Sequence, residues 1–164
     1  MQGQPQVVYA FIDSQNLYRG VRASGWEIDY LKFRNYLRTK YNVCKAFLFI
    51  GYVPKYARLY QYLQECGFIL VFKPVLEIHK RNKETYKGNV DGELVLHAMI
   101  QFPIYDKCVI VSGDGDFLCL IEHLHANQKL YKILAPNQKY SSLLRDYAAY
   151  IVQIDLFRNK VEKK

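Results

Sequence analysis

The sequence predicts an α/β fold with a largely parallel sheet. Two observations point to it: short apolar runs alternate with helix-periodic segments along the whole chain, and several runs are apolar at consecutive positions. Consecutive apolar residues are typical of strands covered by helices on both faces of a sheet. The predicted strands span 7–12, 46–50, 68–72, 108–111, 130–134 and 150–154.

Helical periodicity predicts five helices between these strands, over 30–41, 55–66, 89–102, 116–127 and 141–149. Asp29 precedes the first of them and is expected to cap it. Gly67 follows the second and supplies a stop. In the second helix, four residues follow the i, i+3, i+4, i+7 spacing of a buried stripe: Leu59, Tyr62, Leu63 and Cys66.

Length and composition favour one globular domain over residues 1–164, with short flexible ends at about 1–6 and 158–164. Hydrophobic residues make up 51% of the 164, so a core can form without disulfides or a structural metal. No apolar run approaches the ~20 residues that span a bilayer, and the first six residues do not resemble a signal peptide. A soluble, cytoplasmic protein without a membrane partner is therefore expected.

Net charge indicates the kind of partner. The chain has 23 Lys and Arg against 15 Asp and Glu, a formal charge of +8. Such a surplus favours polyanions, which include nucleic acid and anionic membranes.

Two aspartates follow predicted strands directly. Asp13 comes after the first strand, and Asp114 follows the strand over 108–111. Ligands of open α/β sheets bind beyond the carboxyl ends of the strands, so these two side chains can face one site. Gly113 and Gly115 flank Asp114 and allow a sharp strand-to-helix turn.

Two further aspartates are candidates for the same site. Asp116 opens a predicted helix, where it can serve the helix dipole or a cation. Asp91 heads the apolar stripe of the helix over 89–102 and so points toward the end of the sheet. Glu93 is expected to face solvent, although it could also reach this end of the sheet. Four converging carboxylates would repel one another unless a cation lay among them, and all-oxygen ligation suits Mg²⁺ or Mn²⁺. This is the chemistry of metal-assisted phosphodiester hydrolysis.

Three motifs together resemble the NYN domain of the LabA-like group, within the PIN-like nuclease superfamily. They are Phe-Ile-Asp-Ser-Gln-Asn-Leu-Tyr at 11–18, Lys-Gly-Asn-Val-Asp at 87–91 and Ser-Gly-Asp-Gly-Asp-Phe at 112–117. The chain departs from the commoner Lys-Gly-Val-Asp form, because Asn89 lengthens that element by one residue. Two other folds with acidic pockets fit less well: haloacid dehalogenase phosphatases expect an Asp at Gln15, and TOPRIM domains expect a Glu at Asp13.

The resemblance implies a three-layer α/β/α sandwich and ribonuclease activity that depends on Mg²⁺ or Mn²⁺. It implies that the catalytic and metal-binding residues are Asp13, Asp91, Asp114 and Asp116. Asn16 would orient a ligand or water in the pocket, and Ser112 would contribute to substrate binding.

A basic segment over 79–87 precedes Asp91 and is expected to be an exposed loop. Its cations can contact backbone phosphates, or they can simply be solvated. The candidates are Lys80, Arg81, Lys83 and Lys87, of which Lys87 lies nearest to Asp91. Of the 15 tyrosines, Tyr18 and Tyr86 are candidates for base stacking. Packing explains five others, which lie on helix stripes or in strands: Tyr9, Tyr36, Tyr41, Tyr62 and Tyr150.

The predicted function is a metal-dependent endoribonuclease, in which a metal-activated water attacks the phosphodiester bond. Its partner would be single-stranded or structured RNA, and a homodimer is compatible with the sequence. Two alternatives stay open: a non-catalytic RNA-binding or regulatory protein-interaction module of the same fold, and a DNA-directed nuclease.

Overall fold

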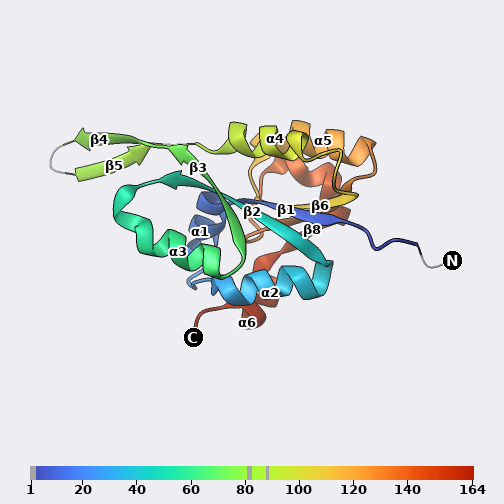
Figure 1. Ribbon diagram of the computed structural model, residues 1–164, viewed down its shortest axis with the longest axis horizontal. Coiled ribbons are helices and arrows are strands. Elements are labelled where there is room, and N and C mark those ends of the chain that lie inside the picture. Colours follow the sequence, from blue (N-terminus) through green and yellow to red (C-terminus); the bar gives the residue numbers. More distant parts are fainter. Residues whose placement is uncertain (1–2, 81–82, 88) are drawn as a thin grey trace.

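A six-stranded parallel sheet forms the centre of the protein (Figure 1). The computed structural model describes residues 3–80, 83–87 and 89–164, and over 77–87 it describes the backbone alone. The strand order is β3-β2-β1-β6-β7-β8, and every pair is parallel. The strands are β1 (Val8–Asp13), β2 (Val43–Tyr52), β3 (Phe68–Pro74), β6 (Lys107–Val111), β7 (Leu130–Ala135) and β8 (Ile151–Gln153). The predicted α/β fold with a parallel central sheet is confirmed.

Helices cover both faces of this sheet and complete the three layers (Figure 1). One face packs against α4 and α5, and the other against α1, α2, α3 and α6. The α-helices are α1 (Ser14–Ala23), α2 (Tyr30–Tyr41), α3 (Ala57–Glu65), α4 (Asp91–Ile100), α5 (Leu118–Ala126) and α6 (Arg158–Val161). Short 3-10 helices are η1 (Pro54–Tyr56), η2 (Gly115–Phe117), η3 (Ser142–Tyr150) and η4 (Ile154–Phe157). Among the helices in the described part of the chain, none has the length and apolar character needed to cross a membrane.

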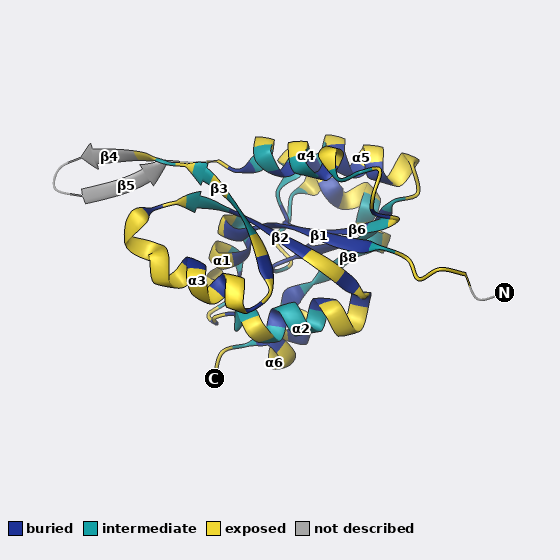
Figure 2. Cartoon of the chain, in the orientation of Figure 1, coloured by how far each residue is buried: buried dark blue, intermediate teal, exposed yellow. Residues whose placement is uncertain are grey.

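The strand β1 shows how the two cores are built. All six of its residues are buried, and Figure 2 shows the central strands as the most buried part of the chain. Val8, Ala10 and Ile12 contribute to the core under α1 and α2, whereas Tyr9 and Phe11 contribute to the core under α4 and α5. This alternation is the period of two expected for a strand covered on both faces.

Two helices form as the sequence predicts. In α2, Oδ1 of Asp29 accepts a hydrogen bond from the backbone N–H of Lys32 at 3.0 Å, so the predicted N-cap is confirmed. In α5 and the 3-10 turn before it, the apolar stripe is fully buried, at Phe117, Leu120, Ile121 and Leu124.

The predicted buried stripe of α3 is wrong at two positions. Leu63 and Cys66 are buried, but Leu59 and Tyr62 are 41% and 43% exposed. Tyr60 is buried instead, because its hydroxyl forms hydrogen bonds of 2.8 and 3.0 Å with backbone groups at the end of β2. The helix is therefore rotated relative to the predicted stripe, and two large apolar side chains remain on the surface.

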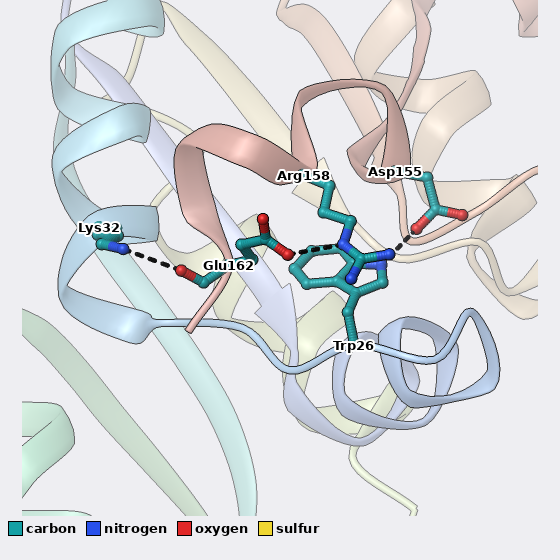
Figure 3. A network of polar contacts seen from close by, with 5 residues as sticks. All are labelled: Trp26, Lys32, Asp155, Arg158 and Glu162. Carbon is teal, nitrogen blue, oxygen red and sulfur yellow. Dashed lines mark hydrogen bonds and ion pairs between the residues drawn. The ribbon is translucent and has the colours of Figure 1, made fainter. Parts of the chain in front are cut away.

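The C-terminal residues 158–164, expected as a flexible end, are packed against the body of the protein (Figure 3). Nε1 of Trp26 donates a 2.7 Å hydrogen bond to Asp155, just before α6. The guanidinium of Arg158 lies 5.7 Å from the centre of the Trp26 ring and donates a 2.7 Å hydrogen bond to Glu162. Most of residues 158–164 are charged, so the sequence pattern does not indicate these contacts.

The basic segment over 79–87 is also different from the expected loop. Its described parts belong to two antiparallel strands, β4 (Leu76–Lys80) and β5 (Lys83–Lys87). The side chains proposed to bind phosphate there lie outside the described part of the structure: Lys80, Arg81, Lys83 and Lys87.

Candidate functional site

Two aspartates meet where the strand order reverses. The chain runs outward from β1 to β3 and then returns to place β6 beside β1, so the carboxyl ends of β1 and β6 form a switch point. Asp13 ends β1 and caps α1, and its Oδ1 accepts a hydrogen bond from the backbone N–H of Asn16 at 3.2 Å. Asp114 caps η2 in the same way, accepting from the backbone N–H of Asp116 at 2.9 Å. Helix capping thus fixes both carboxylates at this edge.

Side chains near the aspartates connect the two segments. Oδ1 of Asn16 accepts a hydrogen bond from the backbone N–H of Gly113 at 2.9 Å. Oγ of Ser112 accepts from the backbone N–H of Asp114 at 3.1 Å, and a hydrogen bond from Ser112 also lowers the pKa of Asp13. Asn16 lines the cavity beside these aspartates, whereas Ser112 is buried and does not line it. Each of the two side chains accepts a hydrogen bond that holds a neighbouring segment in place.

Asp91 reaches the site from α4, of which it is the first residue. Its backbone N–H donates a 2.7 Å hydrogen bond to Oδ1 of Asn89, and Nζ of Lys73 donates to the Asn89 carbonyl. Asn89, which lengthens the motif over 87–91 by one residue, thus forms the turn before α4. Glu93 is half-buried and lies 3.4 Å from Nζ of Lys73, so the expectation that it faces open solvent is wrong.

Three carboxylates converge. Asp13, Asp91 and Asp114 each place one oxygen within 4.8 Å of the other two. Asp13 is buried, whereas Asp91 and Asp114 are half-buried. The fourth predicted ligand, Asp116, is exposed and lies outside this group, although its side chain is close enough to raise the pKa of Asp91. We call Asp13, Asp91 and Asp114 the acidic triad.

The environment opposes ionisation of two members of the triad, Asp13 and Asp91. Burial raises the pKa of Asp13, and the charge of Asp114 adds to this, while hydrogen bonds from the backbone of Asn16 oppose it. Burial raises the pKa of Asp91 to about 6, with a hydrogen bond from Asn89 opposing and the charges of Asp114 and Asp13 adding. Oδ2 of Asp91 is buried and has no hydrogen-bond partner among the residues that the structure describes. A buried, unpaired carboxylate oxygen is costly unless something compensates its charge.

These features fit a divalent cation. The donor set consists of carboxylate oxygens from three separate segments, which hard cations such as Mg²⁺ and Mn²⁺ prefer. The unpartnered Oδ2 of Asp91 is available as a ligand. A cation among the three carboxylates would also offset the repulsion that, in addition to burial, raises the pKa values of Asp13 and Asp91.

The triad lies in a cavity of about 370 Å³ whose walls include two cations absent from the sequence-based prediction. Arg19 projects from α1, and Lys139 comes from the segment after β7. Arg19 follows Asn16 by three residues, so helical spacing would place both on one face once α1 is known. The sequence pattern does not predict α1, so it gives no reason to place Arg19 at the site. Lys139 has no local pattern to mark it.

The glycines beside Asp114 serve close packing. Neither Gly113 nor Gly115 has a positive φ, so neither is required for a left-handed turn. A Cβ on Gly115 would lie 2.4 Å from Oγ of Ser141 and 2.9 Å from Cδ1 of Leu143. The expected turn is therefore present, but the reason for glycine is the approach of the segment before η3.

Tyr18 lies apart from the acidic triad. It does not line the triad's cavity but two neighbouring ones, and Arg22 lies 5.4 Å from the centre of its ring. The other stacking candidate, Tyr86, lies among the residues whose side chains are not described.

The fold and the site define a class of protein. A parallel sheet with an acidic triad at its switch point is accompanied by a match of residues 7–155 to the model of the NYN domain. The chain belongs to the NYN domain family, which is part of the PIN-like superfamily.

Two further proteins are similar to nearly the whole chain. The chain is 26% identical to the low amplitude and bright protein LabA of Synechococcus elongatus, over 98% of this chain and 90% of LabA. It also resembles the crystal structure of a protein of unknown function from Vibrio parahaemolyticus, with a TM-score of 0.78 and 28% identity. That match covers 99% of this chain and 100% of the other.

Proposed function

We propose that this protein is a metal-dependent endoribonuclease that hydrolyses RNA phosphodiester bonds. The observation that supports this most directly is the acidic triad, with its unpartnered buried oxygen at Asp91. The family and the sheet-edge position of the triad are consistent with a nuclease. No side-chain nucleophile is required in this mechanism.

The triad would hold Mg²⁺ or Mn²⁺ through Asp13, Asp91 and Asp114. When bound, the cation supplies Lewis acidity toward a phosphate oxygen and lowers the pKa of a coordinated water. Asp116, beside Asp91, would add negative charge at the rim of the site. Asn16 and Ser112 would hold Asp13 and Asp114 in position, because each side chain accepts a backbone hydrogen bond from the segment after β6.

Substrate binding requires positive charge close to the triad, because phosphates must approach three carboxylates. Arg19 and Lys139 provide this charge on the walls of the cavity. We propose that both contact phosphates on either side of the scissile bond. From the sequence alone, we propose that the basic residues of the segment 79–87 extend the contact along the RNA: Lys80, Arg81, Lys83 and Lys87.

The test is a cleavage assay with labelled single-stranded RNA and single-stranded DNA. Purified protein is incubated with Mn²⁺, with Mg²⁺ or with a chelator, beside the variant Asp114→Asn. We expect RNA cleavage that needs a divalent cation and falls by at least about 100-fold in the variant, because one of three charged ligands is lost. Asp146→Asn is the matched control, since Asp146 is exposed on η3 and lies away from the triad.

The outcomes separate the three functions that the sequence leaves open. Cleavage of DNA but not RNA would favour the DNA-directed nuclease. If the wild type cuts neither, or if Asp114→Asn cuts as well as wild type, the catalytic proposal is wrong. RNA binding without cleavage would then favour the non-catalytic module. The name of the relative LabA refers to no chemical reaction, which is consistent with this alternative.

A further inference from the structure

A second cavity, of about 440 Å³, borders the cavity of the acidic triad. Gln15 and Val90 line both. Each of these residues lies within two positions of a triad member in the sequence, Gln15 after Asp13 and Val90 before Asp91. Since consecutive Cα atoms lie about 3.8 Å apart, the backbone at the border of the second cavity lies within about 8 Å of the backbone of a triad member.

The walls of this second cavity are aromatic and apolar. Four tyrosines contribute to it, from α1, from the start of α2, from η1 and from α3: Tyr18, Tyr30, Tyr56 and Tyr60. Tyr18 is 49% exposed and Tyr56 43% exposed, so both rings present apolar surface to a ligand. Leu59, which helical spacing predicts to be buried, also lines the cavity and is left exposed. We call this second cavity the aromatic cavity.

Two cations lie beside the exposed rings of the aromatic cavity, and one of them, Arg22, is ion-paired with Glu27 at 2.9 Å. The guanidinium of Arg22 lies 5.4 Å from the centre of the Tyr18 ring, and Nζ of Lys55 lies 5.3 Å from that of Tyr56. Each exposed ring thus has a cation beside it. Gln15, at the border between the cavities, is exposed and carries an amide with both hydrogen-bond donors and an acceptor.

We propose that the aromatic cavity binds one unpaired nucleobase of the nucleic-acid strand whose neighbouring phosphodiester lies at the acidic triad. This inference rests on the proposed function, because it takes the triad as the place where the backbone binds. The base stacks on Tyr18 or Tyr56, and its polar edge meets Gln15. A base in a duplex is already paired and stacked, so the substrate is single-stranded at this position.

The experiment measures binding rather than cleavage. Asp114→Asn protein, expected not to cut, is titrated into a labelled single-stranded RNA of mixed sequence and into the same backbone with abasic nucleotides. The double variant Tyr18→Ala/Tyr56→Ala is compared in this background. We expect the Kd for RNA to rise about tenfold or more and the Kd for the abasic strand to stay the same, because a stacked base contributes about 1–3 kcal/mol.

Controls make the result specific. Both tyrosines are exposed, so their replacement should leave the melting temperature near that of the parent protein. Tyr147→Ala is the aromatic control, since Tyr147 packs against His125 and lines neither the aromatic cavity nor the triad's cavity. It should not change either Kd.

Three results would overturn the proposal: an unchanged RNA Kd in the double variant, an equal loss for both probes, or an equal loss in Tyr147→Ala. The proposal and the nuclease function can fail separately. If wild-type protein does not cleave RNA but the tyrosine variant loses affinity for RNA alone, the base site stands and the nuclease function does not. If wild type cleaves RNA and the tyrosine variant binds both probes normally, the nuclease function stands and the base site does not.

Discussion

The backbone N–H of Gly113 donates a 2.9 Å hydrogen bond to Oδ1 of Asn16, 97 residues earlier in the chain. This contact joins the first turn of α1 to the segment after β6, which carry Asp13 and Asp114. This amide side chain therefore helps to set the spacing between the two carboxylates, together with the pairing of β1 and β6. Its hydrogen bond is partly buried, so water does not readily replace it.

Replacing Asn16 with alanine should weaken cation binding. The variant leaves the Gly113 N–H without its acceptor, which costs about 1–3 kcal/mol of stability and lets the two segments separate. We expect a lower melting temperature and a several-fold weaker affinity for Mn²⁺ by titration calorimetry. Asn127→Ala is the control: it also removes one amide hydrogen bond, to the carbonyl of His123, but far from the triad. An Mn²⁺ affinity in Asn16→Ala equal to that of wild type would contradict this role.

Gly115→Ala should damage the site by crowding. The new methyl group would lie 2.4 Å from Oγ of Ser141, which caps η3 by accepting a hydrogen bond from the Leu143 N–H. Either the cap or the turn after Asp114 must move. We expect a loss of about 1–3 kcal/mol in denaturant unfolding, together with weaker Mn²⁺ binding.

A second glycine provides the comparison. Gly92 follows the triad member Asp91, and a Cβ added there would meet nothing within 4 Å. Gly92→Ala should leave Mn²⁺ binding unchanged and stabilise α4 by up to about 1 kcal/mol. Equal effects of the two substitutions would show that crowding at Ser141 is not the cause.

The raised pKa of Asp91 predicts how stability depends on pH without a cation. Its folded-state pKa of about 6 lies above the usual 3.8, so the folded chain binds this proton more tightly than the unfolded chain does. Stability from this group is therefore full below about pH 4 and is lost as the pH rises through 6. Above pH 6 the cost is on the order of 1 kcal/mol, after allowing for the partial exposure of the carboxylate.

The measurement compares wild type with Asp91→Asn by urea unfolding between about pH 4 and pH 8 in chelator. We expect the variant to gain stability relative to wild type as the pH rises. Saturating Mn²⁺ should reverse the order at pH 7.5, because only wild type keeps the complete triad. A constant difference across the pH range in chelator would exclude Asp91 as the group responsible.

The sequence predicts those parts of the site that depend on local pattern and parallel topology. Asp13 and Asp114 each follow a continuous apolar run, and parallel strands bring their carboxyl ends to one edge. Helix α1 is harder to predict, because its buried apolar side chains are only Leu17 and Val21. Two apolar residues four apart give a weak periodic signal. Without α1, Arg19 cannot be placed at the site.

Tertiary packing explains the remaining differences between the predicted and the observed structure. In α3, large side chains occupy two adjacent stripes, so the pattern fits two orientations one residue apart, and the hydroxyl of Tyr60 selects between them. At the C-terminus, Val161 is fully buried within a run of charged residues. A single apolar residue in such a run does not reveal that its segment is packed. These choices depend on contacts between distant parts of the chain.

Arg19 and Lys139 should determine the salt dependence of RNA binding. Each phosphate contact to a single strand contributes about 0.7 to the slope of log K against log salt, so the double variant Arg19→Ala/Lys139→Ala should lower the slope by about 1.4. The slope is measured with Asp114→Asn protein, which keeps the probe intact. Arg38→Ala is the control, because Arg38 is exposed on α2 and bonded to Asn35. A weaker affinity with an unchanged slope would mean that the two cations act on folding or on the base, not on phosphates.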